Sequence, residues 1–265
     1  MAARPRARRW VAREHGAWAM LIAPLVTGIA LGGAAPAHLL LVMAWVSAYL
    51  CYQTFTRWYP AAPRQRTRYR LPLIVYAVGA AAFGVPLLAL EPRLLWWGPV
   101  FALLSAVGVV CVLRRAVRSL LNDLATQAAA CLMTVVAFGL GPRVGDAGLP
   151  FGDAWVPAWV AAACLYAYFA GTSFYVKTMI RERGRSSWYV ASVVYHGVVF
   201  AGAVLLGIGC GRPAAAWYAV IVGALLLGRA AVVPRRWPTA KPLAIGIGEF
   251  ALTVLVIVAA LLLAG

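Results

Sequence analysis

Residues 243–263 read LAIGIGEFALTVLVIVAALLL, an apolar run interrupted by a single charged side chain, Glu249. A helix needs about 20 mostly apolar residues to cross roughly 30 Å of hydrocarbon. A run of this length and composition therefore predicts a transmembrane helix, and it decides the class of protein to which the chain belongs.

Eight further segments of the same kind precede this run along the chain. They span residues 17–34, 37–56, 71–90, 94–113, 119–140, 155–176, 188–210 and 214–232. The sequence thus predicts an all-α, polytopic bundle of about nine transmembrane helices. The longest non-apolar segments, about 57–70, 141–154 and 177–187, are too short for a soluble domain, so we expect residues 1–265 to form a single transmembrane domain.

The composition excludes other classes of protein. Hydrophobic residues make up 64% of the chain and charged residues only 12%, about half the charged fraction of a soluble domain. The formal charge of +17 would fit a nucleic-acid binder if the cations formed one surface, but here they lie between apolar runs. The five cysteines lie in apolar stretches without a CxxC pair, which argues against disulfides and against a thiolate metal site.

The cations also predict the orientation, because Lys and Arg are retained on the cytoplasmic side of a membrane. With the N-terminus in the cytoplasm, 21 cations fall in inner segments, and three, Arg93, Arg143 and Arg212, fall outside. We therefore expect a multi-pass protein of the bacterial cell membrane with an extracytoplasmic C-terminus. As an alternative, the first apolar run and Ala35-Pro36-Ala37 resemble a secretory signal with its cleavage site; the remaining eight helices would keep this orientation.

Ionisable groups within a bilayer are costly and therefore mark candidate functional sites. Most such groups cluster toward the predicted cytoplasmic end, whereas His38, Glu91, Asp146 and Asp153 fall at the other end, where solvated or capping roles are expected. The candidate ligand-binding residues are Glu14, His15, Arg57, Asn122, Asp123, Lys177, Arg181, His196 and Glu249. Each has a simpler alternative, an interhelical hydrogen bond or helix cap that only fixes packing.

Helical spacing places polar side chains on shared faces, because residues three and four apart lie on one side of a helix. Asp123 shares a face with Gln127, and His196 shares one with Ser192. Such faces cannot contact lipid without leaving polar groups unsatisfied. We therefore expect a polar cavity open to the cytoplasm, in which Asp123, His196 and Glu249 approach one another.

Familiar catalytic motifs do not occur in the sequence. There is no HExxH zinc pair, no GxxxxGKS phosphate loop and no GxSxG elbow, so no cofactor is assigned and we expect no metal site. Gly28 and Gly32 form a GxxxG pattern, a sign of close helix packing.

Three stretches carry a family resemblance: 13–20 (REHGAWAM), 118–124 (RSLLNDL) and 175–183 (YVKTMIRER). They resemble the YwiC-like family of bacterial membrane proteins, and the His-Gly-Ala-Trp opening is the most specific part. This resemblance implies a membrane protein but no particular activity.

The layout also resembles, more distantly, the UbiA prenyltransferase superfamily, which has nine helices and cytoplasmic active-site loops after helices 2 and 6. In this chain both segments are long and basic. The family's metal-binding positions, however, read Gln53, Thr54, Arg57 and Ala61 here, and magnesium requires hard oxygen ligands. The resemblance implies a fold but not magnesium-dependent prenyl transfer.

Three functions remain open. The first is the binding or transport of an anionic lipid-like or isoprenoid-type ligand in the cytoplasm-facing cavity, with Arg57, Lys177 and Arg181 at its rim. Next in rank is an accessory subunit of a membrane complex, with unknown protein partners. A diverged UbiA-like enzyme ranks last. The lipid bilayer is an expected partner in all three, and nucleic acid in none.

Overall fold

The computed structural model describes residues 10, 15–145, 148–209 and 211–265, with the side chains of residues 15 and 16 excepted. Glu14, Asp146 and the side chain of His15 therefore lie outside the described residues. The helices are α1 His15–Gly32, α2 Ala37–Trp58, α3 Pro63–Leu90, η2 Pro92–Trp97, α4 Gly98–Leu113, α5 Leu120–Gly139, η3 Asp153–Trp155, α6 Val156–Val176, η4 Lys177–Arg181, α7 Ser186–Gly209, α8 Pro213–Arg236 and α9 Pro242–Ala264. Among them, η4 is a short π-helix that continues α6.

The prediction of an all-α membrane bundle is confirmed. Within the described residues, eight helices are long and apolar enough to cross a membrane, and a shorter apolar helix at Ala17–Gly32 belongs to α1. Large apolar side chains such as Leu39 and Ile208 are exposed, at 69% and 75%. In water this surface would be unfavourable, whereas lipid covers it at no cost, so the protein resides in a bilayer.

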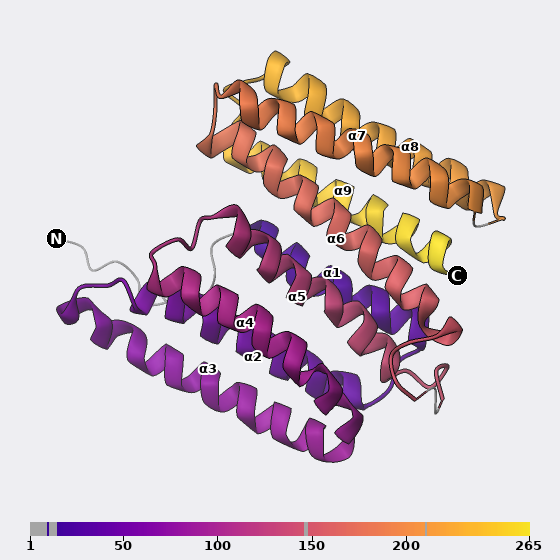
Figure 1. Ribbon diagram of the computed structural model, residues 1–265. Helices are drawn as coiled ribbons and strands as arrows, with labels where there is room; N and C mark the ends of the chain where they lie inside the picture. The colour runs from indigo at the N-terminus through magenta and orange to yellow at the C-terminus, as the bar shows by residue number, and fades with distance from the viewer. Residues whose placement is uncertain (1–9, 11–14, 146–147, 210) are drawn as a thin grey trace.

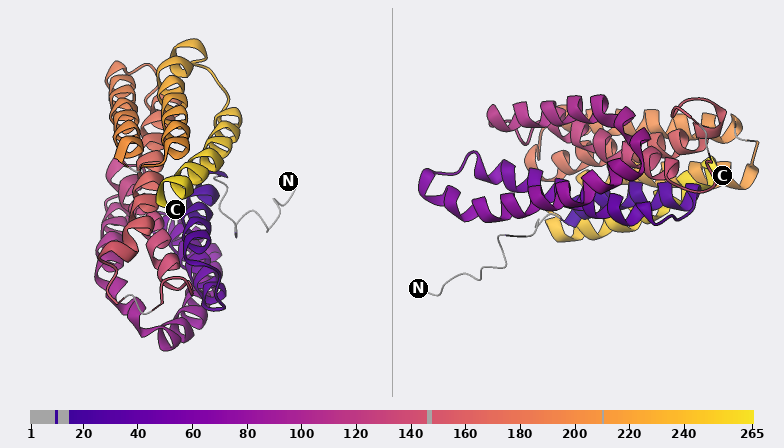
Figure 2. Two further views of the ribbon diagram at one scale, coloured as in Figure 1. Left: turned by 90° about the vertical axis from the view of Figure 1, so that its right-hand side faces the viewer. Right: turned by 90° about the horizontal axis from the view of Figure 1, so that it is seen from below.

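The bundle is built around its middle helices (Figures 1 and 2). Helix α5 packs against α1 and α6, and α6 packs against α9, while the hairpins α2–α3 and α7–α8 flank this centre. Burial follows the same order. In the apolar 18-residue stretch of each helix, 56% is buried in α5 but only 6% in α3. Helices α5 and α6 therefore contact protein on most sides.

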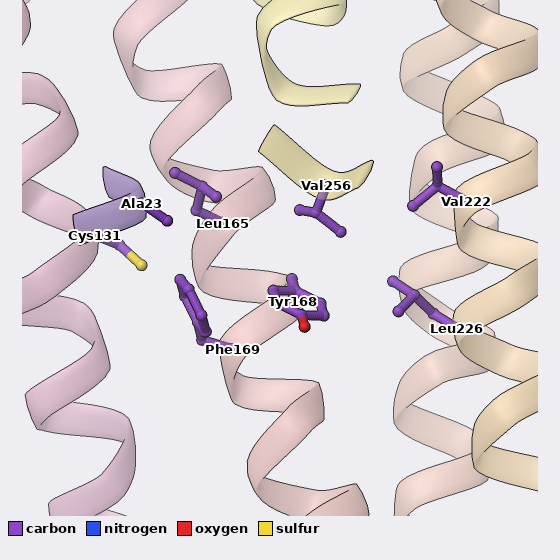
Figure 3. Packing of buried hydrophobic residues seen from close by; sticks show 8 residues of the cluster. All are labelled: Ala23, Cys131, Leu165, Tyr168, Phe169, Val222, Leu226 and Val256. Carbon is purple, nitrogen blue, oxygen red and sulfur yellow. The ribbon is translucent and has the colours of Figure 1, made fainter. Parts of the chain in front are cut away.

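Apolar side chains from five helices meet at this centre (Figure 3). The cluster consists of Ala23, Cys131, Leu165, Tyr168, Phe169, Val222, Leu226 and Val256. Between α1 and α5 the backbones approach closely at glycines, as the GxxxG pattern predicted: a Cβ on Gly32 would lie 2.4 Å from the carbonyl oxygen of Phe138.

One predicted boundary is wrong. The segment 57–70, expected to be a long basic loop, is mostly helical, because α3 begins at Pro63 and carries Arg64, Arg66, Arg68 and Arg70 in its first turns. Proline is favoured at the first position of a helix, and arginine is a good helix former, so the apolar pattern alone underestimated the helix. The loop between α2 and α3 is therefore short, unlike the long loop on which the resemblance to prenyltransferases partly rested.

The connections 59–62, 114–119, 182–185 and 237–241 all lie at one end of the bundle, which we call the basic end (Figure 1, left). The opposite end carries the α5–α6 connection and Gly265. The predicted functional residues that the structure describes lie in the half of the bundle next to the basic end.

Candidate functional site

The first turn of α5 is fixed by polar contacts. The Ser119 hydroxyl caps the helix by accepting from the Asn122 backbone N–H at 3.2 Å, which satisfies an otherwise unpaired donor. The Asn122 side chain donates to the Val117 carbonyl at 2.8 Å and accepts from the Tyr52 hydroxyl at 2.9 Å. Asn122 therefore joins the loop before α5 to helix α2.

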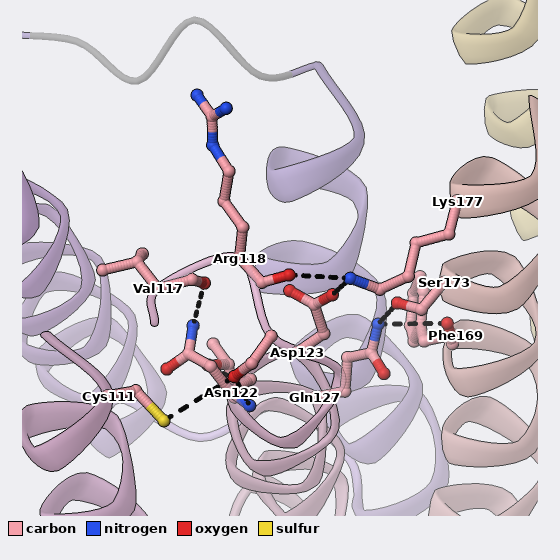
Figure 4. A network of polar contacts seen from close by, with 11 residues as sticks. Cys111, Val117, Arg118, Asn122, Asp123, Gln127, Phe169, Ser173 and Lys177 are labelled. Atoms are coloured by element: carbon pink, nitrogen blue, oxygen red, sulfur yellow. Dashed lines mark hydrogen bonds and ion pairs between the residues drawn. The ribbon is translucent and has the colours of Figure 1, made fainter. Parts of the chain in front are cut away.

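Asp123 lies one residue further along and pairs with Lys177 at 2.8 Å (Figure 4). The Lys177 side chain is only 7% exposed, and its ammonium group also donates to the Arg118 carbonyl at 2.8 Å. A buried ammonium group requires such partners, because removing an ion from water without them costs several kcal/mol. The Arg118 side chain itself extends away from this pair (Figure 4).

Lys177 opens the π-helical turn η4 at the end of α6. Single π-helical turns are rare and often occur at functional sites. Next along the same face of α5, the Gln127 amide donates to the Phe169 carbonyl at 3.0 Å and to the Ser173 hydroxyl at 2.6 Å. We call Arg118, Asn122, Asp123, Gln127 and Lys177 the α5–α6 cluster.

A second group of charges lies between α6, α7, α8 and α9. Arg229 of α8 forms an ion pair with Glu249 of α9, and each side chain is only 10% exposed. The other carboxylate oxygen of Glu249 accepts from the Thr172 hydroxyl at 2.9 Å. The guanidinium carbon of Arg229 lies 4.2 Å from the centre of the Tyr175 ring, a distance typical of a cation–π contact.

His196 completes this second group, which we call the Arg229 cluster (Arg229, Glu249, His196, Tyr168, Thr172 and Tyr175). Its Nε2 lies 3.1 Å from Nη2 of Arg229, and its Nδ1 lies 2.7 Å from the Ser192 carbonyl oxygen. A carbonyl only accepts and a guanidinium only donates. Both bonds therefore form only when His196 is neutral with its proton on Nδ1.

The structure divides the predicted common site in two. His196 and Glu249 are joined through Arg229, whereas Asp123 pairs with Lys177 from a different face of α6. Asp123 and Glu249 both contact α6, but Asp123 reaches it through Lys177 and Glu249 through Thr172. The expected meeting of all three groups is thus replaced by two separately neutralised clusters.

Arg229 was not predicted as a site residue, because it was counted only among the cytoplasmic cations. The signal in the sequence was its position inside the predicted span 214–232. In the observed helices, Arg229 and Glu249 each lie about 10 Å from the basic end of their helix, at 1.5 Å per residue. Arg57 and Arg181, by contrast, occupy the last turn of α2 and the end of η4 and form no ion pair with a described residue.

At the basic end, the described polar side chains of the two clusters contact one another, and the predicted cytoplasm-facing cavity stays a prediction. An open pocket of about 540 Å³ lies at the opposite end, where Glu91, Arg93 and Pro142 contribute to its lining. In the described ranges, no three His, Cys, Asp or Glu side chains gather into a group that could hold a metal ion.

These features define a multispan helical membrane protein with paired charges buried near one end. Residues 11–138 match the family model described as YwiC-like protein. The chain is 30% identical over 186 residues to the Bacillus subtilis protein named "Uncharacterized protein YwiC", covering 70% of this chain and 73% of that one. It is also 28% identical over 188 residues to an uncharacterized Haemophilus influenzae protein, covering 70% and 74%. The chain belongs to the YwiC-like family.

No solved structure matches the chain. The resemblance in layout to the UbiA superfamily therefore stays a prediction. The family match covers α1 to α5 and includes Asn122 and Asp123, but its range ends before Lys177, Arg229 and Glu249.

Proposed function

We propose that this protein binds, and moves within the membrane, an anionic lipid-like ligand whose headgroup contacts the basic end. The observation that carries the proposal is the buried Lys177 ammonium group, which is held by Asp123 and the Arg118 carbonyl. It lies next to exposed arginines that form no ion pair with any acid that the structure describes. A phosphate or carboxylate headgroup is the ligand that such a surface attracts.

The charge balance at this end supports an anionic ligand. The described residues of the basic half include sixteen cations and three acids, Asp123, Glu182 and Glu249, and each acid pairs with one cation. Thirteen of these cations therefore have no carboxylate partner among the described residues. Part of this excess sets the orientation and attracts anionic lipids in general. A specific site must therefore be identified by comparing substitutions of its own cations with substitutions of other cations at the same end.

Arg118, Lys177 and Arg181 are the residues that we assign to the headgroup. The Lys177 ammonium group donates to the backbone carbonyl of Arg118, and Arg181 lies one turn beyond Lys177 at the end of η4. Arg57 is placed at the same end by the Tyr52–Asn122 bond, which ties α2 to α5. Since cations are retained in the cytoplasm, we place the basic end on that side and the C-terminus outside.

The experiment is a titration of the purified full-length protein in neutral detergent with dihexanoyl phosphatidylglycerol, using dihexanoyl phosphatidylcholine as the uncharged comparison. The test variant is Arg118→Gln/Arg181→Gln, which leaves the Lys177–Asp123 pair intact. The control is Arg68→Gln/Arg70→Gln on α3, which removes the same charge from the same end.

We expect one phosphatidylglycerol per chain, bound about tenfold more weakly by the test variant, since a hydrogen bond to a charged group contributes about 1.5–3 kcal/mol. The control should lose about twofold or less, because exposed charges act at long range and are screened. Equal losses in the two variants, or equal binding of both lipids, would contradict the proposal.

A further inference from the structure

The hydrogen bonds of the Arg229 cluster leave two buried polar groups in or next to it without a partner among the described residues. Arg229 donates from Nη1 to Glu249 and from Nη2 to His196, but its buried Nε–H has no partner among the described residues. The Ser192 hydroxyl, one turn before His196, is also buried and has no hydrogen-bond partner in the part of the chain that the structure describes. The large majority of buried side-chain donors in proteins have a hydrogen-bond partner, so these two groups have the capacity to hold an added acceptor.

Protonation of either Glu249 or His196 removes its interaction with Arg229. A protonated Glu249 no longer carries the charge that holds the guanidinium, and a protonated His196 would turn a donor toward a donor. The hydroxyls of Tyr168 and Thr172 from α6 donate to the Glu249 carboxylate. Thr253 donates to the Glu249 backbone carbonyl, and the Tyr175 ring lies against Arg229. Residues 17–32 of α1, which also packs against α9, carry no ionisable side chain.

We propose that Arg229 is a membrane-embedded oxyanion site in which Glu249 is the resident counter-ion and is exchanged for a ligand anion by protonation. Glu249 binds one proton, its carboxylate becomes a neutral carboxylic acid, and the guanidinium accepts one singly charged phosphate-, sulfate- or carboxylate-type oxyanion in its place. Charge is conserved in this step, because one proton and one monoanion enter together.

Charge conservation is what favours this exchange over its alternatives. Binding an anion beside an ionised Glu249 would place two negative charges around one cation in a low-dielectric site, and releasing Glu249 without a proton would leave Arg229 unpaired. The planar guanidinium suits an oxyanion, because it can donate two parallel hydrogen bonds to it. This proposal takes its ligand class from the proposed function, of which it is the proton-coupled step.

The experiment uses probes whose own charge is independent of pH. Hexyl sulfate serves as the amphiphile and methyl sulfate as the tail-free anion. Each is titrated into the full-length protein in neutral detergent at about pH 3.5 and about pH 8, on either side of the ordinary pKa values of Glu and His side chains, about 4.3 and about 6.5. The variants are Glu249→Gln, which is shaped like the protonated acid, and Arg229→Met.

In the wild type, we expect hexyl sulfate to bind more tightly at the lower pH, by up to about tenfold per pH unit for one proton taken up per anion. Glu249→Gln should bind tightly at both values, and Arg229→Met weakly at both. Thr172→Val, which removes a hydrogen bond from the carboxylate, is the second test if Glu249→Gln fails to fold; its binding should tighten at a higher pH than in the wild type.

Equal affinity at both pH values in the wild type, or pH dependence that persists in Glu249→Gln, would overturn the exchange. A lipid-derived ligand is indicated if only hexyl sulfate binds, and a free anion if methyl sulfate binds equally well; either result is compatible with the site. The Arg118→Gln/Arg181→Gln variant separates the two proposals, because loss of the headgroup site weakens phosphatidylglycerol binding without abolishing the pH dependence that Glu249 confers.

Discussion

Gly28 of α1 lies directly against the backbone of Thr134 on α5, where a Cβ added to the glycine would be 2.2 Å from the Thr134 carbonyl oxygen. Helices in lipid associate through close packing of this kind, since apolar burial gives little preference over lipid contact. The contact holds α1 against α5, the helix that positions Asn122, Asp123 and Gln127.

The first prediction concerns this contact. Gly28→Ala should lower the free energy of unfolding by about 1–3 kcal/mol, the usual cost of overpacking, because the opposing atom is backbone and cannot rotate away. Gly202→Ala is the control, since nothing lies within 4 Å of a Cβ there, and it should be neutral or slightly stabilising. Denaturation of the purified protein in mixed micelles measures both; equal stabilities would mean that α1 and α5 are further apart.

The second prediction concerns the buried ion pair of Arg229 and Glu249. Arg229→Met should destabilise the protein by about 3–5 kcal/mol, because it leaves a carboxylate buried without its partner. Arg229→Met combined with Glu249→Met should recover much of this loss, because no unpaired charge remains. A thermal unfolding series in detergent gives the comparison, and a double variant less stable than the single one would show that the pair itself stabilises the fold.

The third prediction concerns the turn between α4 and α5, where Arg115 adopts a φ of 56°. The left-handed region costs a residue with a Cβ about 1–2 kcal/mol, and glycine is favoured at this position after a helix. Arg115→Gly should therefore stabilise the protein by about 0.5–1 kcal/mol after the entropic cost of glycine. Arg114→Gly, at a φ of −83°, should give no gain; equal effects would show that the turn is not strained.

The fourth prediction is topological. A reporter fused after Gly265 should indicate the extracytoplasmic side, and one inserted at residue 239, between α8 and α9, the cytoplasmic side, because cations concentrate at the basic end. A cytoplasmic signal from the Gly265 fusion would contradict both the orientation and the count of nine spans.

Much of the fold was predictable because long apolar runs have one physical solution in a bilayer. Eight of the nine predicted spans begin within a few residues of an observed helix; the exception is α3, whose first turns are polar and therefore carry no apolar signal. Likewise, His38 was expected to be solvated or to cap a helix, yet it is buried and its Nε2 lies 2.7 Å from the Ala137 carbonyl oxygen. Depth along one helix does not reveal which neighbour packs against it.

The candidate site was predicted only in part, for a related reason. Periodicity placed Asp123, His196 and Glu249 on inward faces. It could not show that Lys177 would neutralise Asp123, or that Arg229 would neutralise Glu249 and donate to His196. Those partners depend on how α6 lies between α5 and α9, a long-range arrangement that spacing along the chain does not encode.

The proposed headgroup site at the basic end can be tested with an experimental map of the full-length protein in nanodiscs that contain phosphatidylglycerol. We predict headgroup density within hydrogen-bond distance of Arg118 and Arg181, beside an intact Lys177–Asp123 pair, and its loss in the Arg118→Gln/Arg181→Gln variant. Well-resolved side chains with no lipid density between them, in the same map that shows ordered lipid elsewhere on the bundle, would contradict the account.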